Sequence, residues 1–412
     1  MKMLFKLSLI VLLIPACTGQ NDPIYQIPKD ATPIALSSAQ QKRVSQDNSF
    51  AFDLLKNTIA SSDQTNVFVS PLSVSIALGM AWNGANGDTK TEMETALKMN
   101  GMSVEDINSY YKIMQSTLPG IDPTTKLSIA NSLWYRTGFA VKPDFLKVNT
   151  DYFGAYVKEL DFSQAWAVDT INNWCSKKTN KMIPQVLTKI PNDIVMYLVN
   201  AVYFKGIWRK KFDKVNTNEA NFTNELGNSV KVNMMYQKDT FSYNADSYAQ
   251  YLDMPYGNKA FSMTVILPND GKTTVDVLNY LTVDKWNSII AYLPTTKVEV
   301  YLPRFNNKNN LSLINPLENM GMKLAFSDLA DFSKIADIQL LISSIQHITN
   351  IEVTEEGTEA AAVTIIGVGV TSMPVTPPTP VFKVNKPFLF VIREKSTGVI
   401  LFVGKMGTVD KF

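Results

Sequence analysis

The sequence has 412 residues, of which 45% are hydrophobic and 18% charged, and its formal net charge is +2. This composition is typical of a globular protein, and a charge so near zero argues against nucleic-acid binding through a broad basic field. A chain of this length buries enough core to fold without disulfides, and it contains only two cysteines, Cys17 and Cys175.

The N-terminus has the pattern of a targeting segment. Lys2 and Lys6 precede an apolar run, Leu7–Ile14, which is too short to span a membrane. The small residue Ala16 stands directly before Cys17, which resembles the processing site of a bacterial lipoprotein. The pattern predicts a signal peptide over residues 1–16, a lipid anchor on Cys17, and export to the outer membrane, on its periplasmic or its outer side. The alternative is a plain secretory signal with an incidental cysteine.

The polar, proline-containing residues 17–38 predict a flexible tether. Residues 39–412 are then one domain. Within that domain, Cys175 follows Trp174 in a helical pattern and is expected to be a buried packing residue rather than a reactive thiol.

The first part of the domain predicts helices around one short strand. Apolar residues recur every three or four positions over Gln40–Ser62, which predicts an amphipathic helix. Asn66–Ser70 predicts a short strand, and Pro71 stands where the next helix should begin. That helix, Leu72–Trp82, is apolar nearly all round, so we expect it at the centre of the fold. A further helix is expected from Thr89.

The rest of the domain contains several β-rich stretches. β-branched and aromatic runs bounded by glycine, proline or asparagine predict strands, and the last two form a buried hairpin. The predicted strands are Leu198–Phe204, Ser262–Leu267, Ser344–Thr354, Val381–Ile392 and Val399–Gly404.

The stretch Glu355–Pro380 joins two of these strands and is long for a loop within a compact domain. Read as a strand, it places Thr358 and the small or apolar residues at every second position on one face, which carries no charge. Its one charge within residues 358–370, Glu359, falls on the other face. The pattern predicts a spare strand that can enter a sheet.

The sequence contains few residues or motifs that could form a catalytic site. The chain has a single histidine, His347, in a strand-like run, so a metal cluster of several histidines is excluded and a Ser-His-Asp triad would depend on this one residue. We expect His347 to be a buried, hydrogen-bonded side chain. No glycine-rich phosphate-binding loop is found. The sequence therefore predicts no enzyme, no metal site and no cofactor.

A series of motifs in this order resembles the serpin family of serine protease inhibitors and covers residues from about 40 to the end. The resemblance implies an α+β serpin fold, one domain with three β-sheets, about nine helices and an exposed reactive-centre loop at about residues 357–380. The motifs are Asn66–Met93, Ile129–Phe139, Ile171–Leu187, Leu198–Asp213, Met254–Pro268, Val298–Phe305, Leu317–Ile335, Glu355–Ala362 and Phe382–Ile392.

The same resemblance implies a function. Such a protein acts as a monomer that forms a covalent complex with a target serine protease, or with a papain-like cysteine protease, and traps it by inserting the cleaved loop into the main sheet. The alternative is a non-inhibitory serpin that acts as a carrier or chaperone. The resemblance assigns the loop hinge to Glu356, Gly357, Thr358, Glu359, Ala360, Ala361 and Ala362, a "shutter" under the main sheet to Ser70, Ser73, Asn200 and His347, and a "breach" at the top of the sheet to Trp208. In the shutter, the histidine is expected to bond the asparagine.

The two ends of the loop give different assignments for the bond that a protease would cut. Counting fourteen positions after Gly357 gives Thr371, with Ser372 on the far side, whereas counting back from Asn385–Phe388 gives a position near Thr376. Thr371–Ser372 is the preferred bond because a proline follows Thr376.

Val370 and Met373 are alternates, although a proline also follows Met373. Residues 368–373 contain no arginine, lysine or aromatic residue, which favours a protease of elastase-like or subtilisin-like specificity.

Basic residues give no sign of a polyanion site. A glycosaminoglycan cofactor requires a basic helix face, but the candidate stretch Ser103–Leu118 has only Lys112. One small basic cluster, which we expect to be a solvated rim, consists of Arg209, Lys210, Lys211 and Lys214.

Overall fold

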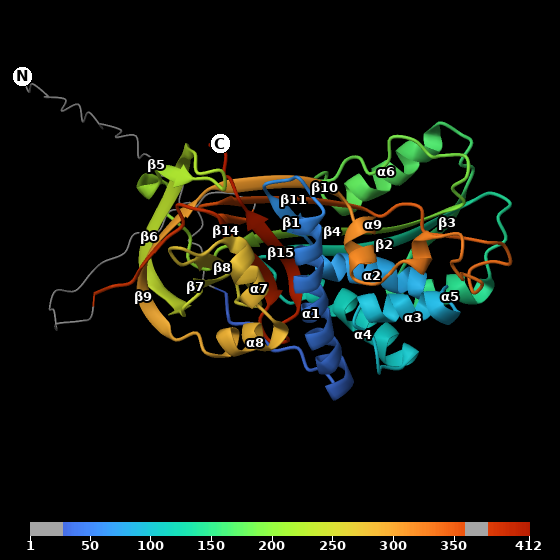
Figure 1. The fold of residues 1–412 in the computed structure, drawn as a ribbon, viewed down its shortest axis with the longest axis horizontal. Helices are drawn as coiled ribbons and strands as arrows, with labels where there is room; N and C mark the ends of the chain where they lie inside the picture. The colour runs from blue at the N-terminus through green and yellow to red at the C-terminus, as the bar shows by residue number, and fades with distance from the viewer. Residues whose placement is uncertain (1–27, 359–377) are drawn as a thin grey trace, which may run out of the picture.

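A computed structural model describes residues 28–358 and 378–412 of the chain (Figure 1). The α-helices of these residues are α1 (Ser38–Ala60), α2 (Pro71–Trp82), α3 (Gly87–Ala96), α4 (Val104–Thr117), α5 (Pro143–Phe153), α6 (Trp166–Lys178), α7 (Thr274–Tyr280), α8 (Val283–Ala291) and α9 (Ile314–Asn319). In this part of the chain, no helix combines the length and the apolar character needed to cross a membrane.

One sheet has six strands in the order β10-β11-β12-β4-β2-β3. Neighbouring strands are antiparallel except β2 and β3, which are parallel. The strands are β10 (Phe305–Ser312), β11 (Gln346–Thr354), β12 (Gly357–Thr358), β4 (Met196–Ile207), β2 (Lys126–Arg136) and β3 (Tyr156–Leu160).

The other strands form one hydrogen-bonded network in the order β1-β15-β14-β8-β7-β6-β9-β13, with β5 paired to β6. The expected three sheets are therefore two networks here, because the long strand β6 pairs with β5, β9 and β7 along its length and joins two sheets into one. The strands are β1 (Val67–Val69), β5 (Asn218–Thr223), β6 (Ser229–Ala245), β7 (Ala249–Pro255), β8 (Phe261–Pro268), β9 (Thr295–Pro303), β13 (Val381–Lys383), β14 (Phe388–Glu394) and β15 (Ile400–Met406).

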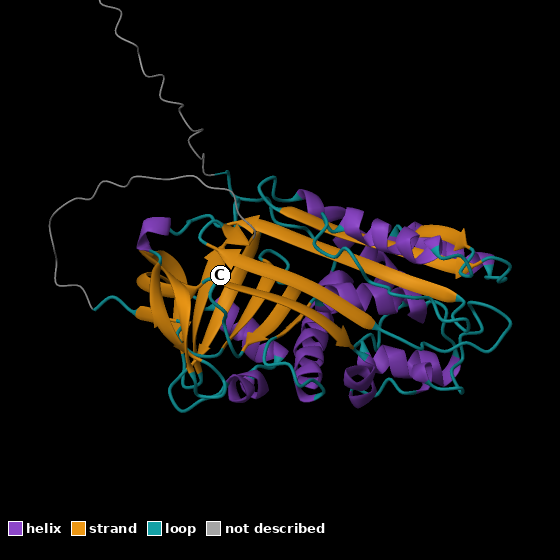
Figure 2. Cartoon of the chain, turned by 90° about the horizontal axis from the view of Figure 1, so that it is seen from above, coloured by secondary structure: helices purple, strands orange, loops and turns teal. Residues whose placement is uncertain are grey.

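Helix α2 lies in the centre, as its apolar sequence predicts. It contacts β4 of the six-stranded sheet and β15 of the larger network, and all of its residues except Ala77 are buried. Its start follows from local chemistry, since the Ser70 hydroxyl accepts from the Ser73 amide and Pro71 occupies the first helical position. Helices α2 to α5 and α9 lie on one side of the six-stranded sheet and α6 on the other (Figures 1 and 2).

The predicted C-terminal hairpin is confirmed, because β14 and β15 pair antiparallel and every residue in both strands is buried. The prediction of a single strand over Val381–Ile392 is wrong. It divides into β13, which pairs in parallel with β9, and β14, which pairs with β8 and β15. Pro387 stands just before β14 and has no amide hydrogen to offer a neighbouring strand.

The prediction of a flexible tether is also wrong for residues 28–37. Residues 28–37 lie against the folded body, where the Ala31 amide donates to the Asn258 carbonyl at 2.9 Å and the Ile34 amide to the Ser396 hydroxyl at 2.9 Å. Ser37 then caps α1 in a capping box with Gln40, which starts this helix slightly before the predicted residue. The rest of the tether and Cys17 lie outside the described residues.

Candidate functional site

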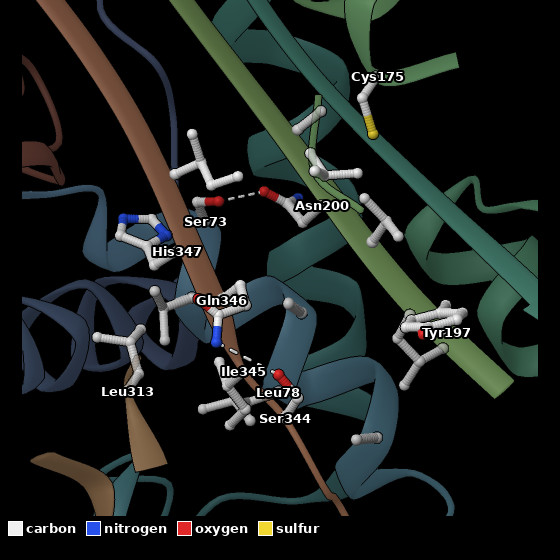
Figure 3. Close-up of a pocket in the computed structure, with 18 of the residues that line it drawn as sticks. Ser73, Leu78, Cys175, Tyr197, Asn200, Leu313, Ser344, Ile345, Gln346 and His347 are labelled. Carbon is white, nitrogen blue, oxygen red and sulfur yellow. Dashed lines mark hydrogen bonds between the residues drawn. The ribbon is translucent and has the colours of Figure 1, made fainter. Parts of the chain in front are cut away.

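A slot divides the six-stranded sheet between β4 and β11. The two residues of β12 occupy its upper end, where Thr358 pairs with Gly206 of β4 and with Val353 of β11. Below β12, the described residues form no strand between β4 and β11, and a cavity of about 540 Å³ opens there (Figure 3). Residues 193–204 line one wall and residues 338–351 the other, with Val74, Leu78 and Ala81 of α2 below. The slot is therefore an apolar channel flanked by two strand edges.

Gly357 is at the point where the chain turns from β11 into the slot. Its φ is +141°, a conformation that L side chains rarely adopt. A Cβ atom at this position would lie 2.1 Å from the Gly206 carbonyl oxygen. A glycine is therefore required here both for the backbone conformation and for the close approach to β4.

Thr358 is the first loop residue inside the sheet. Its side chain is 3% exposed, and its hydroxyl lies 2.9 Å from the hydroxyl of Tyr256. The alternation of the sequence predicts this inward direction, and the structure confirms it. Burial raises the pKa of Tyr256 well above its ordinary value, so its hydroxyl stays protonated and available as a donor.

Two buried glutamates hold the turn that leads to Gly357. Glu355 accepts hydrogen bonds from Arg304 Nε at 2.9 and 3.0 Å, from Arg304 Nη2 at 2.7 Å and from the Thr217 hydroxyl at 2.5 Å. Burial by itself raises the pKa of Glu355, but the bonds from Arg304 and Thr217 outweigh it and lower that pKa below its ordinary value. Glu355 is therefore a charged anchor at the start of the hinge.

The second glutamate corrects the prediction of a solvated basic rim. Glu356 is paired with Lys211 at 2.8 Å, and both side chains are less than 10% exposed. Lys214 lies 3.7 Å from the same carboxylate. Lys210 pairs with Asp239 at 2.5 Å, partly exposed as expected. Part of the cluster thus neutralises the hinge instead of facing solvent, because the fold brings Glu356 over it.

Trp208 lies directly under the hinge, at the position that the resemblance assigns to the breach. Its indole nitrogen donates to the Thr354 carbonyl at 2.9 Å, and its amide donates to the Glu356 carbonyl at 2.8 Å. Its ring stacks on Tyr256, with centroids 4.4 Å apart and planes 9° apart. Trp208 and Tyr256 together form an aromatic floor for the turn.

The four shutter residues all line the slot, partway along its length, and Figure 3 shows Ser73, Asn200 and His347 there. The Ser70 amide donates to His347 Nε2 at 2.9 Å, whereas the Ser73 hydroxyl donates to the Asn200 side chain. Within the described part of the chain, His347 and Asn200 are not bonded to each other, so the expected bond is wrong for this structure. The reason is the slot itself, which separates β11 from β4, so each side chain bonds to the start of α2 instead.

The histidine makes stability depend on pH. Burial without a charged partner lowers the pKa of His347 from 6.5 to about 4. The unfolded chain therefore binds this proton first, and the contribution present above pH 6.5 should be lost as pH falls to about 4, by about 3 kcal/mol in total.

We expect the urea midpoint of the wild type to fall more steeply between pH 7 and pH 4.5 than that of His347→Gln. The variant keeps an acceptor for the Ser70 amide but cannot titrate. Equal slopes for the two proteins would contradict the prediction.

Other predicted residues cannot be placed. The hinge residues Glu359–Ala362, the candidate bait residues Val370, Thr371, Ser372 and Met373, and the lipidation site Cys17 lie outside the described residues.

Cys175 is buried as expected, and burial raises the pKa of its thiol to about 12. Across residues 28–358 and 378–412, no group of three His, Cys, Asp or Glu side chains is placed to hold a metal ion.

Sequence reasoning missed Arg304 and Tyr256. Arg304 stands between Pro303 and Phe305 at a strand end. A single cation beside buried residues indicates that an anionic partner is needed, but the local sequence does not identify that partner. Tyr256 lies within a motif that carries the family resemblance, yet no local pattern indicates that it contacts Thr358.

Comparisons with known proteins agree with this geometry. Residues 45–408 match the family model described as "Serpin (serine protease inhibitor)". The chain is 33% identical to Iripin-8 of Ixodes ricinus, over 90% of this chain and 97% of that protein. It is 33% identical to the leukocyte elastase inhibitor of Sus scrofa, over 87% and 97%. The crystal structure of tengpin, a thermophilic serpin, in its native state superposes with a TM-score of 0.83 at 35% identity, covering 92% of this chain and 97% of tengpin.

Proposed function

The chain belongs to the serpin family, and we propose that it is a suicide-substrate inhibitor of serine proteases. The observation that carries this proposal is the slot between β4 and β11. It already holds Gly357 and Thr358 in register with both neighbouring strands, and it continues below them as an apolar cavity. The sheet thus has room for the remainder of one strand, and the chain that follows Thr358 has the alternation of a strand with one uncharged face.

The chemistry begins as ordinary proteolysis. The protease serine attacks the carbonyl carbon of the bait residue, and its histidine transfers the serine proton to the departing amine. The peptide bond breaks, an ester joins the bait residue to the protease, and the new N-terminus leaves. The loop is then free to follow Thr358 into the slot. A papain-like cysteine protease would form the equivalent thioester.

Insertion traps the ester. The fourteen residues from Thr358 to Thr371, counted in the sequence, span about 46 Å as a strand. The attached protease is carried over that distance. Because a displacement of about 1 Å at a catalytic group can cost about 100-fold in rate, hydrolysis of the ester stops.

Burial and backbone pairing favour insertion. Each medium-sized apolar side chain buried in the cavity contributes about 1.5–3 kcal/mol, and the edges of β4 and β11 gain a partner strand. The native form is then a kinetic trap, whose lifetime depends on a barrier rather than on its free energy.

The slot is long enough to take a strand that ends at Thr371, the preferred bait residue. When the register of Thr358 with Gly206 is continued along β4 and past its start, residue 371 falls opposite Asp193, which lines that wall. Continued along the other wall, the same residue falls opposite Leu340, which also lines the cavity.

We expect elastase or subtilisin to form a complex with the protein that survives denaturing electrophoresis. The released C-terminal peptide should begin at Ser372, as its mass would show. A protease whose serine has been blocked chemically is the control and should give no complex. Complete cleavage of the loop without a covalent complex with either protease would contradict inhibition and would favour a carrier or chaperone role.

A further inference from the structure

Residues 28–36, here called the strap, lead into α1 and contact Arg209, just after β4, and the β7–β8 turn. Two backbone amides fix the strap to two different turns: the Ala31 amide donates to the Asn258 carbonyl, and the Ile34 amide donates to the Ser396 hydroxyl. The side chains of Ala31, Ile34 and Leu36 pack against the core. The strap is therefore attached along its length and not only where it enters α1.

One carboxylate ties the strap to two elements. Asp30 Oδ1 lies 2.9 Å from Arg209 Nη2, and Asp30 Oδ2 lies 2.8 Å from Lys259 Nζ. The hydrogen bond from Lys259, followed by the charges of Lys259 and Arg209, lowers the pKa of Asp30. Arg209 Nη1 also donates to the Pro28 carbonyl and to the Gly257 carbonyl, both at 2.9 Å. A single guanidinium thus joins the strap, the end of β4 and the β7–β8 turn.

The end of β4 and the β7–β8 turn lie next to the two aromatic residues under the hinge, Trp208 and Tyr256. Arg209 follows Trp208 directly, and the β7–β8 turn begins at Tyr256. Trp208 bonds the hinge backbone and Tyr256 contacts Thr358. For β4 to move away from β11, Trp208 must shift relative to Tyr256. That shift would pull Arg209 from the strap, which the Ala31 bond and the Lys259 pair hold to the turn.

We propose that the strap restrains the breach and slows spontaneous insertion of the uncleaved loop, with Asp30 as its main polar contact. This inference rests on the proposed function, because it assigns a regulatory element to the same slot. The strap lies outside the sheet, and none of its residues lines the cavity. Its loss should therefore lower the barrier to opening without removing any group that insertion requires.

The test compares three full-length proteins: wild type, Asp30→Asn, and Asp63→Asn as a matched control. Asp63 is exposed between α1 and β1 and makes no ion pair within the described residues. Two rates are measured, namely backbone hydrogen exchange over residues 206–209 and 256–258, and conversion at raised temperature to a form that resists urea.

We expect Asp30→Asn to raise both rates by about 2- to 5-fold, as for the loss of an exposed ion-pair network, and high salt to reduce that difference. A protein that lacks residues 28–36 should convert faster still. Rates for Asp30→Asn that match Asp63→Asn, together with unchanged exchange in the truncated protein, would overturn the proposal. Covalent-complex formation is assayed on the same batches, and hydrogen exchange does not depend on it, so a failure of the inhibitor proposal is recognised separately.

Discussion

Replacing Thr358 with arginine should convert the protein from an inhibitor into a substrate of its target protease. Thr358 is buried between β4 and β11, with its hydroxyl against Tyr256 and apolar residues below. In the native state a guanidinium at this position would displace β12 from the slot, and insertion would then have to bring it back between β4 and β11 without a partner charge, which costs several kcal/mol. Because insertion and ester hydrolysis compete, an insertion barrier higher by about 3 kcal/mol slows trapping about 100-fold or more. The ester is then hydrolysed, and the protease is released.

The measurement is the ratio of covalent complex to cleaved protein after incubation with elastase or subtilisin. Thr358→Val is the matched control, since it keeps the size of the side chain and removes only the hydroxyl contact with Tyr256. We expect the valine variant to form nearly as much complex as the wild type and the arginine variant to be almost entirely cleaved. Thermal unfolding of all three proteins checks that each is folded at the start. If the arginine variant formed as much complex as the wild type, insertion would not pass through Thr358.

Local sequence predicted the parts of this fold that local chemistry determines. Ser70 and Pro71 define the start of α2, and its apolar surface places it at the centre. The alternation after Gly357 predicted that Thr358 faces inward, because the period of a strand does not depend on its neighbours. The requirement for glycine at position 357 follows from the backbone of β4, which only the structure supplies.

The parts that sequence reasoning missed depend on contacts between distant segments. Arg304 and Glu355 are 51 positions apart, and nothing near either residue indicates the other. Lys211 belongs to a basic run that is expected at a surface, and only the position of Glu356 buries it. The strap has the polar, proline-containing sequence of a linker, and it is held by groups that belong to the body, such as Arg209 and Asn258.

Reversing the charge of Glu355 should destabilise the native state more than any other single change near the hinge. Glu355 is 1% exposed and receives three hydrogen bonds from Arg304, so Glu355→Lys leaves two cations facing each other beside the turn. We expect a loss of about 3 kcal/mol, the lower end of the range for removing one partner of a buried pair, because Arg304 remains 27% exposed. The urea midpoint should fall accordingly, and spontaneous conversion to a urea-resistant form should accelerate.

Two further variants test whether the loss of stability comes from the contact between Arg304 and Glu355. Glu352→Lys makes the same charge change three residues earlier on β11, at a partly exposed position, and should shift the urea midpoint little. Combining Glu355→Lys with Arg304→Glu restores opposite charges and should recover part of the loss, although Thr217 then donates to no carboxylate at position 355. If Glu355→Lys and Glu352→Lys unfolded at the same urea concentration, the contact with Arg304 would not be what holds the hinge. Other contacts of the hinge, such as the stacking of Trp208 on Tyr256 and the Glu356–Lys211 pair, would then hold it in place.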